Sequence, residues 1–547
     1  MSAAGPHGPS FHYRGTQLME QIENEHAGLT RRQLIKGVGL VSVSTGLFAG
    51  LPLTSVGAAT AKAKKGGTLR IGVVGSTNDI IDGQAIVNKA DQARLMTGWE
   101  TLMTFDGNFA PQLEYGLAES VKVLSPTKAV VTLRKGLKFS NGKAVTADDV
   151  VYSWQRLLDP KLALPTYKAA TDFYDPALIK KIDSRTVEFN LKKPSINIEA
   201  TFAAYVNSVV PVGYTREGPQ IGTGPYKLKS FTPGRESTHV RNPYYWRKGK
   251  PVFDTVIIQD FGDKTALVNA LLSGQIDAAV DIPLTAIQQI QANPALTVNE
   301  VNGGGWLCIT MQTDVKPFDD PRVRQALRLI IDRQEILTRA LGGHGAIGND
   351  LFGKIDPLYN ANKFPQRAQD IAKAVALLNA AGFTKEKPLE FELPAPDDTG
   401  GLIPLVQAFA EHAKKTDGVV KVTPKAMDST YWDTTYTKVG IFTSFWSPRD
   451  YLAQVAAGAG YGETNIEKTN KGYNELFVQA SGEPDLAKRT AIIKQMQKID
   501  YEEGGFIIPA FNAFADGYVT KLKGVVKGRA SSLNMDFYGR GYQEFSF

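Results

Sequence analysis

The sequence predicts an α/β protein of more than one domain, built around a partly parallel sheet. Its 547 residues exceed what a single hydrophobic core usually supports, so two or three domains are expected. A hydrophobic content of 43%, with 10% aromatic residues, is ordinary for a globular protein. Strand-like and helix-like segments alternate along the chain, an order that is typical of βαβ units.

Residues 1–61 have the three parts of an export signal: a basic start, an apolar middle, and small residues before a polar stretch. Segment 30–36, TRRQLIK, closely resembles the twin-arginine consensus, which predicts export of the folded protein by the twin-arginine machinery. The apolar middle, 37–56, is interrupted by Gly, Ser and Pro, which disfavours a permanent membrane helix. Cleavage is expected after Ala59-Thr60-Ala61, with 61–63 as the alternative. Because no cysteine lies nearby, we expect a periplasmic protein without a lipid anchor.

Charge, cysteine and histidine usage argue against several classes of function. The formal net charge of +7 is spread thinly, without a Lys/Arg block of the nucleic-acid-binding type, so no nucleic-acid partner is expected. Cys308 is the single cysteine, which excludes an intramolecular disulfide and predicts a small buried hydrophobe. Outside the first 61 residues only His239, His344 and His412 remain, without ligand-type spacing. We therefore expect neither a metal nor another cofactor.

The first strands and the first helix are predicted to have a structural role, although they are rich in charged residues. Segment 66–74 is a strand, and 129–139 alternates apolar and polar residues like paired strands. Asn141-Gly142 is a tight-turn dipeptide. The helix that follows starts with Thr146 and Asp149 at the spacing of a capping box. The lysines and aspartates of this region therefore predict strand ends, a turn and a helix cap rather than a catalytic site.

A βαβ unit is predicted in the middle of the chain. Residues 255–259 form a strand, and Asp263 is the expected N-cap of the next helix. Gly274 ends that helix, and a second strand begins at Ile276. This order implies parallel pairing within one sheet.

A longer helix is expected from Asp320, its N-cap, to Gly342, its C-terminal stop, with Pro321 at the first helical position. Its three arginines are assigned to a solvated flank: Arg322, Arg324 and Arg328. A last long helix spans about 485–503 and is followed by the apolar strand GFIIPAF.

Enzyme motifs are weak in this sequence. Residues 343–348 fit the string G-x-G-x-x-G, but a helix ends just before them, whereas the dinucleotide motif needs a preceding strand and a following helix. This segment is therefore interpreted as a glycine-rich loop. Walker A, H-E-x-x-H and G-x-S-x-G strings do not occur. Paired carboxylates lie at helix starts or turns, where capping and the helix dipole explain them: 148–149, 319–320 and 397–398.

An ordered series of segments resembles the bacterial extracellular solute-binding proteins of family 5, the dipeptide/oligopeptide-type binding components of ABC importers. The series covers nearly all of 66–547 and consists of GGTLRIG, LRKGLKFSNGKAVTADDVVYSW, IGTGPYKLKSF, RNPYYWRKGKPVFDTVII, ALLSGQIDAA, KPFDDPRVRQALRLIIDRQEI, GYNELFVQA and GGFIIPAF.

The resemblance implies an α/β, periplasmic-binding-protein type II-like clamshell of two lobes, with an additional domain inserted in the first lobe. By analogy, lobe I comprises 66–100, 222–305 and 507–547, the insert comprises 101–221, and lobe II comprises 306–506. Two crossing segments would let the lobes close over a ligand by a hinge motion.

The resemblance also implies a non-enzymatic, monomeric solute-binding protein that delivers a small polar ligand to ABC permease subunits. Peptides or peptide-like molecules are the first ligand class, and an opine, a sugar phosphate or another anionic solute is the second. An exported hydrolase is the alternative from another class, and it would need a Ser or Cys beside a His. A periplasmic chaperone or sensor on the same fold is the third possibility.

Peptide-binding members of the family carry a W-x-x-D segment whose aspartate holds the peptide ammonium group. The matching stretch here is IFTSFWSPRDYLAQV, where Trp446 matches the tryptophan, Arg449 is third after it and Asp450 fourth. Either Asp450 takes the role of that aspartate, or Arg449 faces the cleft or the solvent. A cleft-facing arginine would repel an ammonium group and favour a carboxylate or phosphate.

Three further residues are weaker candidates for ligand contact. Trp306 lies at the expected lobe border, where it either stacks on a ligand or packs in the core. Asn78 and Asp79 follow the first strand, where folds of this kind place a ligand loop.

Overall fold

A computed structural model describes this protein over residues 66–547, except for 87, 107–109, 163, 165–166, 357, 361–362, 398, 429 and 526–541. The predicted export signal, 1–61, lies outside the described residues. Within the described residues, no helix has the length and apolar character needed to cross a membrane.

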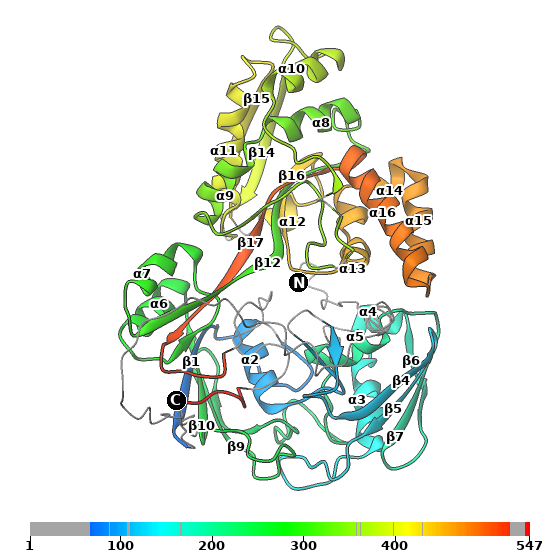
Figure 1. Ribbon diagram of the computed structural model, residues 1–547, viewed down its shortest axis with the longest axis vertical. Coiled ribbons are helices and arrows are strands. Elements are labelled where there is room, and N and C mark those ends of the chain that lie inside the picture. Colours follow the sequence, from blue (N-terminus) through cyan, green and yellow to red (C-terminus); the bar gives the residue numbers. More distant parts are fainter. Residues whose placement is uncertain are drawn as a thin grey trace, which may run out of the picture.

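The molecule has two lobes joined by a long sheet (Figure 1). Strand order in that sheet is β16-β12-β17-β11-β1-β10-β9-β8, and β13 also pairs with β17. Strands β12 (Leu296–Met311) and β17 (Phe506–Val519) pair antiparallel over most of their length and run from one lobe into the other (Figure 1). They are the two crossing segments that the resemblance implies. Their register shifts between Asn302 and Trp306, at the run of three glycines that the sequence places there.

Lobe I contains the predicted βαβ unit. Strand β1 (Thr68–Val74) pairs in parallel with both β10 (Thr255–Phe261) and β11 (Ala278–Ala279). Between the latter two lies α6 (Lys264–Leu272), whose first turn is capped because the Ala266 amide donates to the Asp263 carboxylate at 2.8 Å. The parallel pairing and the cap are thus confirmed. The other elements of this lobe are α2 (Lys89–Gly98), β8 (Tyr226–Thr232), β9 (Glu236–Arg241) and α7 (Ile287–Gln291).

The inserted part carries its own antiparallel sheet and core. Strand order is β4-β5-β7-β6, comprising Ala118–Ser125, Lys128–Leu133, Thr186–Leu191 and Tyr174–Lys181. Helix α3 (Ala147–Leu157) buries Trp154 in the same core. Its start is closed as predicted, because the Asp149 carboxylate accepts from the Thr146 amide at 2.8 Å and from the Thr146 hydroxyl at 3.0 Å. Gly142 has a positive φ of 87°, so the expected tight turn is confirmed. Short elements complete the insert: β2 (Thr104–Phe105), β3 (Pro111–Gln112), α4 (Tyr167–Thr171) and α5 (Ile198–Ala203).

Lobe II is mostly helical and has two groups of buried hydrophobic residues. Its first group lies among α8 (Pro321–Ile330), α9 (Arg333–Leu341), α10 (Ile371–Ala380), β14 (Leu389–Pro396), α11 (Leu402–Lys414) and β15 (Val420–Met427). The short strand β13 (Gly345–Ile347) pairs with β17. The second group lies among β16 (Ile441–Trp446), α13 (Tyr451–Ala456), α14 (Ile466–Thr469), α15 (Lys471–Gly482) and α16 (Leu486–Glu503). Helix α16 and strand β17 confirm the last predicted helix and strand. The exact limits of the three predicted domains stay a prediction.

The single helix predicted between Asp320 and Gly342 is wrong. Two helices occupy this segment, α8 and α9, and the chain is extended at Ile331 and Asp332 between them. The Asp332 carboxylate accepts from the Glu335 amide at 3.0 Å and so caps the second helix. Both predicted ends are confirmed, because Asp320 caps α8 and Gly342 ends α9 in the left-handed conformation.

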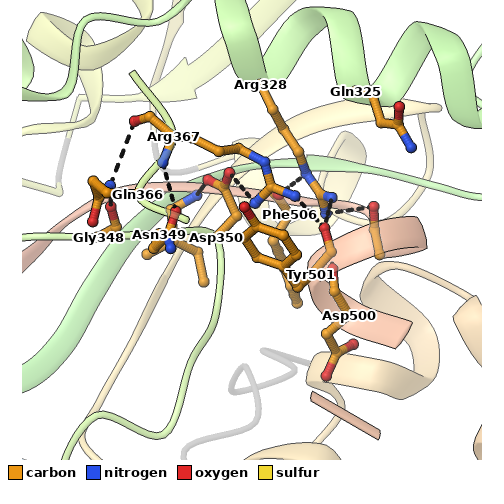
Figure 2. Close-up of polar contacts among 12 residues, drawn as sticks. Gln325, Arg328, Gly348, Asn349, Asp350, Gln366, Arg367, Asp500, Tyr501 and Phe506 are labelled. Carbon is orange, nitrogen blue, oxygen red and sulfur yellow. Dashed lines mark hydrogen bonds and ion pairs between the residues drawn. The ribbon is translucent and has the colours of Figure 1, made fainter. Parts of the chain in front are cut away.

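The expectation that the arginines of α8 form a solvated flank is also wrong for two of the three. Arg322 is exposed, but Arg324 and Arg328 are buried. The Arg328 guanidinium donates to four backbone carbonyls: those of Asp500, Tyr501, Gly504 and Phe506 (Figure 2). Asp500 and Tyr501 belong to the last turn of α16, Gly504 follows it, and Phe506 begins β17, so Arg328 ties the end of this helix to the start of the strand.

A buried ion-pair network fixes the loop that follows β13. The Asp350 carboxylate accepts from Arg367 at 3.0 Å (Figure 2). It also accepts from Arg333 at 2.6 Å and from the Ile508 amide at 2.9 Å. Because Asp350 is fully buried between these partners, the two ends of the loop are held against β17. The middle of the same loop places Phe352 and Asp356 beside Tyr451.

Candidate functional site

The predicted ligand segment lies at the end of β16 and the start of α13. Trp446 is the last residue of β16 and stands opposite Trp306 on the crossing strand β12. Asp450 caps α13, because its carboxylate accepts from the Ala453 amide at 2.8 Å. This cap explains why an acid stands four residues after Trp446, whether or not it also contacts a ligand.

Four aromatic rings from three segments form a stack beside this segment. Ring centroids are 5.9 Å apart between Trp446 and Trp306, 5.9 Å between Trp306 and Phe352, and 4.9 Å between Phe352 and Tyr451. The planes in each pair are within 18° of parallel. Trp306 is 0% exposed, so in this structure it packs in the core, which is the second of its two predicted roles.

A buried carboxylate fixes Trp446 from the side. The Glu463 carboxylate accepts from the Trp446 indole at 3.1 Å, from the Ser444 hydroxyl at 2.8 Å, and from the Tyr436 hydroxyl. It ends a single π-helical turn, Ala459–Glu463, an arrangement that is frequent at functional sites. Burial raises the pKa of Glu463 to about 7, although these hydrogen bonds act in the opposite direction. Sequence reasoning missed Glu463, because only the folded chain brings it beside β16.

Arg449 and Asp450 are both buried, in different settings. Burial raises the pKa of Asp450 to about 8, and the charge of Asp356 acts in the same direction. Asp356 in turn accepts from the Tyr451 amide at 3.0 Å. The Arg449 guanidinium lies over the Trp446 ring, 5.4 Å from its centroid. Burial lowers the pKa of Arg449 to about 10, against the opposing effect of the Asp450 charge.

A cavity of about 340 Å³ lies between the insert and lobe II, where α4 and α5 face α13 and α15 (Figure 1). Of the six predicted site residues, Arg449 alone lines it. The insert supplies one wall, which includes Phe173, Tyr174, Pro194, Ser195, Ile196 and Asn197. Lobe II supplies the other, which includes Arg449, Leu452, Ala453, Ala456, Phe477 and Ser481.

The two lobe I candidates are placed elsewhere. Asn78 is exposed in the loop after β1. Asp79 is buried in its own lobe, where its carboxylate accepts from Arg94 at 2.8 Å, from the Ser76 amide at 2.7 Å and from Asn88 at 2.5 Å. Burial opposes the charged form, but these bonds outweigh it and lower the pKa of Asp79. The structure therefore favours a role for Asp79 in holding the loop rather than in touching a ligand.

The three histidines are separate in the described part of the chain. His239 is buried in lobe I, where desolvation and the charge of Arg94 lower its pKa to about 3. His344 pairs with Glu300 at 2.9 Å, and His412 pairs with Glu335 at 2.8 Å. Among the described residues, no group of three or more His, Cys, Asp or Glu side chains is placed to hold a metal ion.

Comparison with known proteins gives a consistent result. A sequence model of the bacterial extracellular solute-binding proteins, family 5 (middle region), matches residues 112–468. Heme-binding protein A of Haemophilus influenzae is 25% identical over 473 residues, which is 78% of this chain and 84% of that protein. The periplasmic murein peptide-binding protein MppA of Escherichia coli is 28% identical over 429 residues, 72% of this chain and 78% of that protein.

Solved structures share the fold. The unliganded open form of the murein tripeptide-binding protein MppA superimposes with a TM-score of 0.72 at 22% identity, covering 89% of this chain and 98% of that one. The binding protein AgaA of A. tumefaciens R10, solved with agropinic acid, gives a TM-score of 0.69 at 23% identity, covering 88% and 99%. At this level of identity the likeness establishes the fold, a clamshell of periplasmic-binding-protein type, and leaves the ligand open.

Proposed function

Because the chain belongs to the bacterial extracellular solute-binding proteins of family 5, we propose that it is a periplasmic, non-enzymatic component of an ABC importer. It captures a small polar ligand between its lobes and passes it, unchanged, to the permease subunits. Relatives named for binding a murein peptide and heme, and a fold neighbour solved with an opine acid, support a binding role without selecting the ligand.

The observation that carries this proposal is the cavity between the insert and lobe II. Strands β12 and β17 are the paired segments about which two lobes can rotate. The cavity is lined by side chains of both parts and includes the buried cation Arg449. A concave, mostly apolar site with a few fixed polar groups is what small-ligand binding requires.

The ligand most compatible with these residues carries an acid group. Arg449 lines the cavity, whereas the Asp450 carboxylate accepts from the first turn of α13. A planar guanidinium binds carboxylates and phosphates through two parallel hydrogen bonds. Peptides and opines meet this requirement through their carboxylates, and sugar phosphates meet it through their phosphate.

A thermal-shift screen of the mature protein, residues 62–547, against peptides, opines and sugar phosphates tests the function. A solute that binds the native state alone raises the melting temperature, by an amount that grows with its concentration. Mass spectrometry of the recovered solute should show an unchanged molecule. A chemically altered product would contradict the binding role and favour the exported hydrolase, and a screen without any binder would contradict solute capture.

Export through the twin-arginine route is the second part of the proposal. It predicts cleavage after Ala61 and a soluble protein in the periplasmic fraction. Replacement of Arg31 and Arg32 by lysine should leave the precursor in the cytoplasm. The reverse exchange, lysine to arginine, at the exposed Lys421 and Lys425 should leave export intact. Export of the double-lysine precursor would contradict this route.

A further inference from the structure

We propose that the insert forms one wall of the ligand site, and that the ligand is a small amphipathic carboxylate. Its acid group binds Arg449, and its apolar body lies between the insert and the helices α13 and α15. This inference rests on the proposed function, and it names the ligand class and a specificity-determining surface for the same site.

The apolar part of the argument is the composition of the facing walls. Phe173 packs on the core of the insert, and Leu452 belongs to the aromatic-rich core of lobe II. Ile196 lies in the insert and yet packs against that lobe II core, so the two parts are in contact at the edge of the cavity. Phe173, Ile196, Leu452 and Phe477 therefore offer apolar surface from both sides. A sugar would lose the hydration of its hydroxyl groups here without gaining equivalent partners.

The polar part of the argument consists of two buried groups. Arg449 is 5% exposed, and an anion that reaches a desolvated guanidinium gains more than it would at the surface. On the opposite wall the Asn197 side-chain oxygen is buried and accepts no hydrogen bond. Because a buried acceptor without a donor is costly, a ligand N–H group would relieve it. A carboxylate, an N–H group and an apolar substituent together describe an N-substituted amino acid or a short peptide with an apolar side chain.

Size sharpens this description. A volume of about 340 Å³ lies at the low end of the roughly 300–1,000 Å³ that small-molecule sites occupy. It suits a substituted amino acid or a dipeptide rather than an extended oligopeptide. The insert would then select the ligand by the bulk of its apolar substituent.

Three small probes separate these contributions. N-benzoylglycine carries the acid, the N–H group and the apolar ring. N-benzoylglycinamide, in which a primary amide replaces the acid, lacks the negative charge. N-acetylglycine keeps the acid and the N–H group but lacks the ring. In isothermal titration calorimetry of the mature protein at pH 7.5, N-benzoylglycine should bind, and each of the other two should bind about tenfold more weakly or worse. Equal binding of all three probes, or binding of none of them, would overturn the inference.

Two cavity-filling variants test the walls. Ala456→Trp fills the cavity from α13, and Pro194→Trp fills it from the insert; both residues line it and are exposed, so neither change disturbs a core. Each should weaken N-benzoylglycine binding about tenfold or more, because the added ring occupies the space of the ligand. Val478→Trp is the matched control, since Val478 lies on α15 beside Phe477 but is 64% exposed and does not line the cavity. The affinity of the Val478→Trp variant for N-benzoylglycine should equal that of the wild type.

The outcomes separate this inference from the proposed function. Unchanged affinity in Pro194→Trp, together with loss in Arg449→Gln, would show that the insert is not part of the site. If none of the probes binds while another solute in the thermal-shift screen does, the ligand class proposed here is wrong and solute capture stands. If Ala456→Trp fails to fold, Pro194→Trp alone decides, because it lies in a loop between elements of the insert.

Discussion

Two buried arginines, one in each lobe, lie near the predicted ligand segments, and their surroundings differ. Arg94, in α2 of lobe I, donates to Asp79 at 2.8 Å, to Asp91 at 3.1 Å and to Asp260, and also to the Ser237 hydroxyl at 3.1 Å. All of these partners belong to lobe I. Its donors thus serve to join α2, the loop after β1 and the end of β10.

Arg449, in lobe II, contacts an aromatic ring, lies within reach of the Asp450 charge and borders a cavity. Its guanidinium lies over Trp446, and its side chain borders the space shared with the insert. A charged residue at the right place in the fold is therefore a ligand candidate only if a cavity adjoins it. The sequence alone does not distinguish the roles of these two arginines. The difference between them arises in the folded protein, from the distant segments that pack around each side chain.

The largest effect expected from this comparison is on stability in lobe I. Arg94→Met should lower the free energy of unfolding by about 3–5 kcal/mol, because it leaves buried carboxylates without their cation. Denaturation by urea, followed by far-ultraviolet circular dichroism of the mature protein, measures this loss.

A matched arginine provides the control for that variant. Arg322 pairs with Asp320 but is exposed on α8, so Arg322→Met should cost about 1 kcal/mol or less. Equal losses for the two variants would mean that the lobe I network contributes no more than a surface ion pair.

The next effect concerns Glu463, which accepts a hydrogen bond from the Trp446 indole in lobe II. Its pKa is raised from 4.5 to about 7 by burial, so the folded state favours the protonated acid. The resulting stabilisation is complete below about pH 4.5 and is lost as the pH rises through 7. Relative to Glu463→Gln, the wild-type protein should therefore lose about 3 kcal/mol of unfolding free energy over this interval, since one pKa unit corresponds to about 1.4 kcal/mol.

Unfolding curves at pH 5, 6, 7 and 8 test this sign. Glu411→Gln, at an exposed position of α11, should follow the wild-type pH profile. A Glu463→Gln variant whose stability falls with pH as steeply as that of the wild type would show that this acid is ionised throughout.

The sequence predicted local structure better than it predicted the partners of charged residues. Caps such as Asp263 and Asp320 depend on neighbours within three residues and were correctly predicted. The break between α8 and α9 was missed, although Asp332 and Glu335 have the spacing of a capping box and offered a signal. Apolar periodicity continues across this break and hides it.

Arg328 shows why longer-range contacts were not predictable. It lies next to the apolar stripe of α8, and its four acceptors are backbone carbonyls more than 170 residues away. Backbone carbonyls carry no sequence signal. Glu463 was missed for a similar reason, because its hydrogen bonds to Ser444 and Trp446 depend on the return of the chain through a π-helical turn. The tryptophan segment was proposed through the family resemblance, which Trp446 matches and from which Arg449 and Asp450 depart, and its ligand role stays a prediction.

The smallest effect is expected at Asn78, the remaining lobe I candidate. Its side chain is exposed in the loop that Asp79 and Arg94 hold in place. Asn78→Ala should change the free energy of unfolding by less than about 0.5 kcal/mol. If lobe II and the insert provide the main ligand contacts, the Asn78→Ala variant should lose less affinity than Arg449→Gln for any solute found in the screen. Calorimetric titration of both variants with the same solute measures the difference. If Asn78→Ala loses as much affinity as Arg449→Gln or more, the acid-binding contact lies on lobe I. The cavity beside Arg449 would then not mark the lobe that binds the acid group.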